Sequence, residues 1–139
     1  MSQRPSKKAT IAVGVVLRGQ EVLIAQRQTI ESGQGSGLLH WVFPGGTIED
    51  NESEEEAMQR EVLEETGYTV DIVQHIDTRE HPQFPVVMSY FLCKLHSNEM
   101  LTMKTKEIRE TRWVPIRELK EYFTSNLNPA VMAVLESTL

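Results

Sequence analysis

The sequence predicts an α/β (α+β) fold, a layered sandwich of helices around a mixed β-sheet. Two observations carry this prediction: segments rich in Val, Ile, Tyr and Phe recur along the chain, and three segments with helical signals lie among them. The chain has 139 residues, 40% of them apolar, and it contains no repeat or linker. This length and composition suffice for one hydrophobic core. We therefore expect a single domain that spans residues 1–139.

The first predicted elements are two antiparallel strands. Thr10–Arg18 is β-branched and places alternate apolar residues on one face, and Glu21–Arg27 follows after two turn residues, which is typical of a hairpin. Thr29–Gly37 is rich in glycine and serine and has no periodicity, so it is expected to be a loop. A short strand at Leu39–Phe43 follows, and Pro44-Gly45-Gly46 is expected to end it.

The next predicted element is a helix over residues 54–66. Ser53 and Glu56 have the spacing of a capping box, in which each side chain bonds the backbone N–H of the other residue. Good helix formers continue to Thr66, and Gly67 can then adopt the left-handed conformation that ends a helix.

The second half of the chain contains three more predicted strands and two more helices. The strands are rich in β-branched and aromatic residues, and the last helix has apolar spacing and a proline at its start. The strands are Tyr68–Asp77, Val86–Leu95 and Glu110–Val114, the helices are Arg117–Phe123 and Ala130–Ser137, and Thr78–Pro85 joins the first two strands.

The acidic residues are concentrated in one segment. The net charge of the chain is −6, but the stretch from Glu49 to Glu65 holds nine acidic residues and one basic residue. Such clustering of like charge on a helix is unfavourable unless solvent or a cation offsets it. No basic stripe with interleaved aromatic residues is present, so no nucleic-acid polymer is expected as a partner.

Cysteine usage and hydropathy indicate the compartment. Cys93 is the only cysteine, which excludes an internal disulfide and favours a reducing compartment, so we expect a cytoplasmic protein. No uninterrupted apolar run approaches the roughly 20 residues that span a bilayer, so no membrane partner is expected. The sequence leaves the oligomeric state open, and a homodimer is one of the options.

Three glutamates of the predicted helix point to a metal site. Glu61, Glu64 and Glu65 are related as i, i+3 and i+4, so their carboxylates share one helix face. Carboxylate oxygens so arranged suit Mg²⁺, with Mn²⁺ as the alternative, and a solvated acidic helix face is the other interpretation. Gly45 and Gly46 precede the helix, and their bare backbone could approach a metal or a phosphate closely.

The stretch GTIEDNESEEEAMQREVLEETGY fits the pattern G-x5-E-x7-R-E-U-x-E-E-x-G-U, in which U is an apolar residue. The matching residues are Gly46, Glu52, Arg60, Glu61, Val62, Glu64, Glu65 and Gly67. This pattern resembles the Nudix hydrolase family. The W-x-F-P-G-G run before it, and Glu107 ahead of an R-W-V strand after it, resemble the MutT-like group. Tyr68 departs from the aliphatic residue usual there, which concerns packing more than chemistry.

The resemblance implies a fold, an activity and a set of metal ligands. The fold would be a Nudix-type α/β/α sandwich, and the activity would be hydrolysis of a nucleoside diphosphate linked to another moiety. The metal ligands would be Glu61, Glu64 and Glu65, together with a backbone carbonyl of Gly45 or Gly46, and the metal would be Mg²⁺ or Mn²⁺.

The resemblance also implies catalytic roles. Arg60 and Glu52 match positions that form an orienting ion-pair network in the family. Glu61 could accept the proton of the attacking water, but a downstream loop glutamate does so in some relatives, and Glu107 and Glu110 lie in the corresponding region. The general base therefore stays open among these three glutamates.

Other residues are candidates for substrate binding. Trp41, Phe84 and Tyr90 offer stacking surfaces for a nucleoside, and Arg79 could meet phosphates or a sugar. Asn128 sits where MutT-type enzymes carry an asparagine that reads a guanine-like base, and the competing interpretation is a helix N-cap. His40, His75 and His96 show no metal-ligand spacing, and the histidines are interpreted as structural or surface groups.

These expectations lead to one main function and two alternatives. The main one is Mg²⁺-dependent hydrolysis of a small nucleotide, a nucleoside triphosphate with oxidised forms included, to a monophosphate and pyrophosphate. The first alternative is an ADP-ribose or nucleotide-sugar diphosphatase. The second is a non-catalytic nucleotide-sensing module, which would typically have lost carboxylates of the motif.

Overall fold

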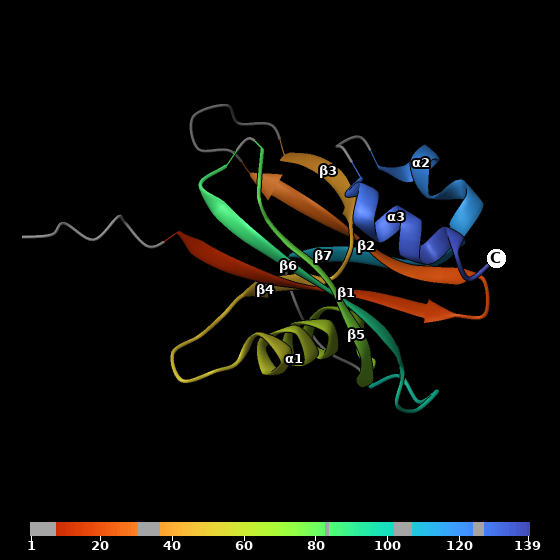
Figure 1. Cartoon of the computed structure of the whole chain (residues 1–139), viewed down its shortest axis with the longest axis horizontal. Helices are drawn as coiled ribbons and strands as arrows, with labels where there is room; N and C mark the ends of the chain where they lie inside the picture. Colours follow the sequence, from red (N-terminus) through yellow and green to blue (C-terminus); the bar gives the residue numbers. More distant parts are fainter. Residues whose placement is uncertain (1–7, 31–36, 83, 102–106, 124–126) are drawn as a thin grey trace, which may run out of the picture.

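The computed structural model describes residues 8–30, 37–82, 84–101, 107–123 and 127–139 (Figure 1). Seven strands and four helical segments are present in these ranges. The strands are β1 (Ala9–Arg18), β2 (Glu21–Ile30), β3 (Gly37–Val42), β4 (Gly45–Thr47), β5 (Val70–Glu80), β6 (Val86–Leu95) and β7 (Ile108–Pro115). The helices are α1 (Glu54–Thr66), the 3₁₀ turn η1 (Ile116–Glu118), α2 (Leu119–Tyr122) and α3 (Pro129–Glu136).

The strands form one mixed sheet. The strand order is β3-β2-β1-β6-β5, with β4 paired to β1 and β7 paired to β2. The β1–β6 pair is parallel and runs from Ala9 opposite Val86 to Leu17 opposite Lys94. The other pairs are antiparallel, so the predicted mixed sheet is confirmed.

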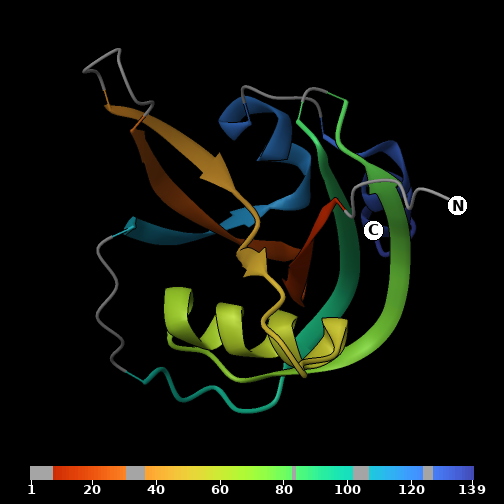
Figure 2. The ribbon, with the colours of Figure 1, turned by 90° about the vertical axis from the view of Figure 1, so that its left-hand side faces the viewer.

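Helices cover both faces of the sheet, as the sequence predicts. One core lies between α1 and the sheet and includes Met58 and Val62 of the helix. The other core lies on the opposite face and includes Leu119 of α2 and Leu135 of α3. Figure 2 shows α1 on one side of the twisted sheet and the shorter helices on the other. The architecture is therefore an α/β/α sandwich.

The position of α1 depends on a glycine in the middle of β1. A Cβ atom at Gly14 would lie 2.7 Å from Cγ2 of Val62 and 3.0 Å from Sδ of Met58. The helix therefore packs directly on the backbone of β1, at a distance that a larger residue would not allow. Alanine at this position would push the acidic helix away from the sheet.

The ends of α1 are those that the sequence predicts. The Ser53 side chain accepts a hydrogen bond from the Glu56 backbone N–H (3.0 Å), and the Glu56 carboxylate accepts one from the Ser53 N–H (2.9 Å). Gly67 ends the helix in the left-handed region with φ 82°. Tyr68 then packs edge-on against Trp113, with ring centroids 5.6 Å apart, which confirms a packing role for this residue.

The strand before Pro44-Gly45-Gly46 ends as predicted, since β3 stops at Val42, but Gly45 then begins a further strand that the sequence does not predict. After Pro44 the chain forms β4, and Gly45 lies opposite Val13 of β1. A Cβ at Gly45 would be 2.4 Å from the Ala12 carbonyl oxygen, so the missing side chain is what allows β4 to pair this closely. The glycines therefore extend the sheet rather than interrupt it.

Other predicted boundaries change because backbone pairing outweighs local composition. The predicted loop Thr29–Gly37 is shorter, since Thr29 and Ile30 belong to β2 and Gly37 begins β3, while residues 31–36 lie outside the described residues. The ladder with β6 carries β5 three residues past Asp77, to Glu80. The helix expected over Arg117–Phe123 is a 3₁₀ turn followed by α2, without a side-chain N-cap.

We predict that Gly67→Ala destabilises the protein more than Gly19→Ala does. Both glycines have positive φ, 82° and 60°, which costs a non-glycine residue about 1 kcal/mol. Only at Gly67 would the new Cβ also meet a backbone atom, the Leu101 carbonyl oxygen. Urea denaturation should therefore give losses of roughly 1 kcal/mol for Gly19→Ala and 3 kcal/mol or more for Gly67→Ala. Equal losses would contradict the packing of residue 101 on this helix end.

Candidate active site

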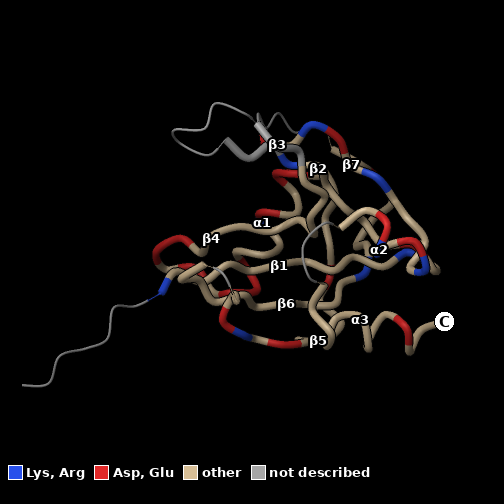
Figure 3. The backbone as a smooth tube through the Cα atoms, turned by 90° about the horizontal axis from the view of Figure 1, so that it is seen from above, with Lys and Arg blue, Asp and Glu red and all other residues tan. Residues whose placement is uncertain are grey.

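The acidic face of α1 meets the sheet at Gly46. A Cβ built on Gly46 would lie 2.4–2.7 Å from the carboxylate atoms of Glu61. The carboxylate therefore occupies the space that a side chain at residue 46 would fill. In Figure 3 much of the segment between β4 and α1 is red, the colour of its acidic residues. The bare backbone of β4 and the first of the three glutamates thus lie side by side.

Glu65 is the most buried of the three glutamates, with a side chain that is 3% exposed. Its Oε1 accepts a hydrogen bond from the Gly45 backbone N–H at 3.1 Å. Its Oε2 accepts one from Nη2 of Arg27, on β2, at 2.5 Å. The same Nη2 donates to the Gly45 carbonyl oxygen at 3.1 Å. Glu65 therefore joins the end of α1 to two strands.

Burial raises the pKa of Glu65 from 4.5 to about 7. The positive charge of Arg27 and the hydrogen bond from Gly45 oppose this rise, whereas the neighbouring Glu61 carboxylate adds to it. A carboxyl group with such a pKa, in contact with a second carboxylate, marks a place where the protein has concentrated negative charge.

Arg60 connects three of the glutamates that the sequence singled out. Its Nε and Nη2 donate to the two carboxylate oxygens of Glu52 at 2.7 and 3.0 Å, and Nη1 donates to Glu61 at 2.8 Å and to Glu64 at 3.2 Å. The Arg60 guanidinium lowers the pKa of Glu52, while these carboxylates raise the pKa of Arg60. The ion-pair network expected around Glu52 and Arg60 is therefore present.

The structure does not bring Glu61, Glu64 and Glu65 to a single point. Among the described residues, no three His, Cys, Asp or Glu side chains form a metal-ligand cluster. The reason is that Glu64 is bonded to Arg60 and is 45% exposed, whereas Glu65 is bonded to Arg27. The donor chemistry nevertheless suits a hard divalent cation, since the carboxylates of Glu61 and Glu65 lie beside a glycine backbone that leaves room for them.

The two downstream glutamates occupy different positions. Glu107 is exposed and immediately precedes Ile108, which lies opposite Arg27 in the β2–β7 ladder. Glu110 lies opposite Gln26, on the other face of β7, where it forms an ion pair with Arg112 at 2.6 Å. Because directly opposed residues share a face, Glu110 is directed away from the α1 side of the sheet. Glu107 precedes β7, so the strand pairing does not assign it to a face of the sheet.

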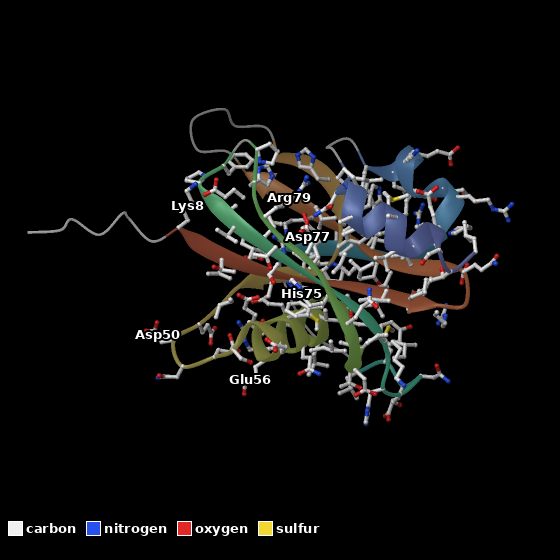
Figure 4. All side chains as sticks on the ribbon, viewed as in Figure 1. Lys8, Asp50, Glu56, His75, Asp77 and Arg79 are labelled. Carbon is white, nitrogen blue, oxygen red and sulfur yellow. The ribbon has the colours of Figure 1, made fainter. Side chains whose placement is uncertain are left out.

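A second group of candidate residues gathers on the face away from α1. Asn128 is 3% exposed and its Oδ1 accepts a hydrogen bond from the Ala130 N–H at 2.8 Å, which confirms the N-cap interpretation. Its Nδ2 donates to Asp77 at 3.1 Å, and Asp77 lies opposite the buried Tyr90. Figure 4 labels Asp77 and Arg79 on β5. The Nε of Arg79 is buried and has no hydrogen-bond partner within the part of the chain that is described.

The other two aromatic candidates lie elsewhere. Trp41 packs edge-on against Tyr122, with centroids 5.6 Å apart, and the Arg112 guanidinium lies 5.0 Å from its ring centroid. Phe84 is 60% exposed in the β5–β6 connection, where its ring lies 4.9 Å from that of His81. The structure therefore does not bring the proposed stacking residues Trp41, Phe84 and Tyr90 together in one compact cluster.

Two charged residues of these groups were missed by sequence reasoning. Arg27 is the last residue of the predicted strand Glu21–Arg27, and nothing in that apolar run indicates that it reaches Glu65, 38 positions away. The sequence also gives no indication that Asp77 contacts Asn128, because this contact depends on how α3 packs on β5. Only the fold brings these pairs together.

Comparison with known proteins identifies the family. The profile of the NUDIX domain matches residues 8–134. The chain belongs to the Nudix family. It is 40% identical over 101 residues to an 8-oxo-dGTP diphosphatase of Proteus vulgaris, an alignment that covers 70% of this chain and 87% of that one. An RNA pyrophosphohydrolase of Nitratiruptor sp. is 28% identical over 96% of this chain and 91% of its own length.

Solved structures share the fold of this chain. A NUDIX hydrolase from Nitrosomonas europaea superposes with a TM-score of 0.76 at 20% identity, covering 94% of this chain and 87% of that one. A MutT structure, from work on Aliivibrio salmonicida and Vibrio cholerae, gives a TM-score of 0.67 at 25% identity, covering 96% and 100%. The protein is a MutT-like Nudix hydrolase, an enzyme that cleaves a pyrophosphate linkage in nucleoside diphosphate derivatives. Among the described helices, none has the length and apolarity needed to cross a membrane.

We predict that Glu65 makes this Nudix hydrolase less stable as the pH rises when no metal is present. Because its folded-state pKa of about 7 exceeds the ordinary value of 4.5, the folded state binds more protons than the unfolded state between these pH values. The contribution of Glu65 to the free energy of unfolding is therefore greatest below pH 4.5, and it falls by at most about 3 kcal/mol as the pH rises through 7.

The test compares wild type with Glu65→Gln by urea denaturation in EDTA from pH 4.5 to 8. The wild-type free energy of unfolding should fall relative to that of the variant as the pH rises, since glutamine does not titrate. Parallel pH profiles for the two proteins would show that the carboxyl group ionises as freely in the folded chain as in the unfolded one.

Proposed function

We propose that this enzyme hydrolyses a nucleoside triphosphate, with oxidised purine nucleotides among its substrates, to the monophosphate and pyrophosphate, and that it requires Mg²⁺ or, in its place, Mn²⁺. The observation that carries the metal requirement is the Glu61 carboxylate seated against the bare backbone of Gly46, beside the buried Glu65. The 40% identity to a protein named 8-oxo-dGTP diphosphatase supports the choice of substrate.

The carboxylates of Glu61, Glu64 and Glu65 and the backbone carbonyl of Gly46 would hold the metal. A pyrophosphate linkage is inert in water partly because its negative oxygens repel a nucleophile, and a bound divalent cation neutralises that charge and lowers the pKa of a bound water. Coordination requires Glu64 to turn away from Arg60, which its 45% exposed side chain allows.

The remaining catalytic residues act on those carboxylates and on the water. Glu52 binds both Nε and Nη2 of Arg60, and this fixes the guanidinium so that Nη1 holds Glu61 in place. Glu61 or one of the downstream glutamates accepts the proton of the attacking water, and the pairing of Glu110 with Gln26, on the face of the sheet away from α1, weighs against Glu110.

The nucleoside would bind on the opposite face of the sheet, among Asn128, Tyr90, Trp41, Phe84 and Arg79. Asn128 already makes one hydrogen bond with each end of its amide, and both the oxygen and the nitrogen can make one more. The buried Nε of Arg79 has no hydrogen-bond partner among the described residues, and Arg79 would contribute positive charge toward an anionic ligand. Trp41 and Phe84 would contribute ring surface for stacking.

Residues 1–139 would act as one domain. The enzyme would work in the cytoplasm, and its substrates would be small nucleotides rather than a nucleic-acid polymer. The single, buried Cys93, whose pKa burial raises to about 12, supports a protein that works without disulfides. A homodimer stays open, since no feature of the proposed site requires a second chain.

We predict that Glu64→Gln lowers kcat by on the order of 100-fold or more, because it removes a charged ligand from the metal shell. Glu55→Gln is the matched control, since it makes the same change at an exposed position of the same helix. Steady-state hydrolysis of 8-oxo-dGTP and dGTP with Mg²⁺ measures the effect, and circular dichroism checks the fold. Full activity in Glu64→Gln would contradict its assignment as a ligand.

The products identify the substrate class. A nucleoside triphosphate should yield pyrophosphate and a monophosphate, whereas ADP-ribose should be cut slowly if the proposal holds. Release of AMP and a sugar phosphate at a higher kcat/KM would instead assign the enzyme to the nucleotide-sugar diphosphatases. Inactivity toward every nucleotide of the panel would support the non-catalytic alternative.

A further inference from the structure

Arg27 contacts two of the atoms that border the proposed metal site. Its Nη2 lies 2.5 Å from Oε2 of Glu65 and 3.1 Å from the Gly45 carbonyl oxygen. The other carboxylate oxygen of Glu65 is occupied by the Gly45 N–H. One positively charged nitrogen thus bridges a carboxylate and a backbone carbonyl, which is a contact that a metal cation could also make.

The contact neutralises a carboxylate that cannot reach bulk water. The Glu65 side chain is 3% exposed, and an ionised carboxylate in such a place requires a counter-charge. In the described residues Arg27 is the cation that pairs with it. The neighbouring Arg60 is bonded instead to Glu52, Glu61 and Glu64.

The pair has the geometry of an exchangeable contact rather than of a permanent one. An arginine built into a fixed carboxylate pair usually donates through two nitrogens. Arg27 reaches Glu65 with Nη2 alone, and its buried Nε has no hydrogen-bond partner in the described ranges. The Arg27 side chain is also 33% exposed, so it can turn toward solvent or toward a ligand without unfolding the strand that carries it.

We propose that Arg27 is the counter-cation of the metal-free site, and that it makes the binding of metal and of nucleotide cooperative. When a divalent ion binds the Glu65 carboxylate, the Arg27 guanidinium loses its counter-charge and lies beside a second positive charge. The phosphates of a nucleotide restore that counter-charge. Metal alone therefore binds weakly, and metal with nucleotide binds tightly. This inference rests on the proposed function, since it takes Glu65 to be a metal ligand.

The experiment titrates Mn²⁺ into wild type, Arg27→Met and Arg27→Lys at pH 8.5, followed by the electron paramagnetic resonance of free Mn²⁺. Each protein is titrated without nucleotide and with a non-hydrolysable triphosphate analogue. Methionine keeps the length of the side chain and removes its charge, whereas lysine keeps the charge and can make the same single contact. No step of this measurement depends on turnover.

Without nucleotide, Arg27→Met should bind Mn²⁺ roughly fivefold more tightly than wild type, because no ion pair has to be broken. The analogue should tighten Mn²⁺ binding in wild type and in Arg27→Lys, and by a much smaller factor in Arg27→Met. Mn²⁺ binding by Arg27→Met that equals or falls below that of wild type would overturn the inference and leave Arg27 with a packing role.

Two controls separate this inference from the proposed function. Thermal unfolding by circular dichroism shows whether Arg27→Met is folded, and if it is not, Arg27→Gln takes its place with the same expectation. Glu65→Gln should weaken Mn²⁺ binding in an otherwise wild-type chain. If Glu65→Gln does not weaken Mn²⁺ binding, the assignment of Glu65 as a metal ligand fails. If Glu65→Gln weakens Mn²⁺ binding but Arg27→Met does not strengthen it, only the inference about Arg27 fails.

Discussion

The close approach of α1 to the sheet is the constraint on which the rest of the site depends. It exists because residues 14, 45 and 46 are glycines. A Cβ would meet Val62 at the first position, the Ala12 carbonyl at the second and the Glu61 carboxylate at the third. At Gly14 the helix α1 packs on β1, at Gly45 the strand β4 packs on β1, and at Gly46 a carboxylate of α1 packs on β4. Together these contacts fix how far the acidic helix stands from the strand that would present backbone oxygens to a metal.

The approach concentrates negative charge, and two arginines from different parts of the chain offset it. Arg60, on the helix, binds Glu52, Glu61 and Glu64, and Arg27, on β2, binds Glu65. The burial of Glu65 still raises its pKa to about 7. A charge arrangement of this kind lowers the local stability of the fold, and it favours the binding of a cation to the carboxylates or of an anion to the arginines. The site is thus organised around ligands rather than around its own stability.

Much of this arrangement can be predicted from the sequence, because it is encoded within short distances along the chain. The capping box at Ser53 and the left-handed end at Gly67 are local features, and both are confirmed. The pairing of Glu52 with Arg60 spans eight residues across one helix start, and the spacing of the family pattern captures it. The layered fold follows from the alternation of strand and helix periodicity, which is also largely local.

The parts that sequence reasoning missed depend on contacts between distant segments. Arg27 reaches Glu65 across 38 positions, and Asp77 reaches Asn128 across 51. In the sequence, Gly45 and Gly46 indicate the end of a strand. In the structure they begin the strand β4, because the backbone of β1 is close enough to pair with them. The shared helix face of Glu61, Glu64 and Glu65 was correctly inferred, but Arg27, which binds the Glu65 carboxylate, is supplied by the fold.

The central claim is that the carboxylates of α1 and the backbone of β4 hold a divalent ion against a polyphosphate. The most direct test is anomalous diffraction from crystals grown with Mn²⁺ and a non-hydrolysable nucleoside triphosphate. The account predicts manganese peaks within coordination distance of Glu61 and Glu65 oxygens, beside Gly46, with the triphosphate completing the shell. Manganese bound away from α1, with Glu65 still paired to Arg27, would contradict it.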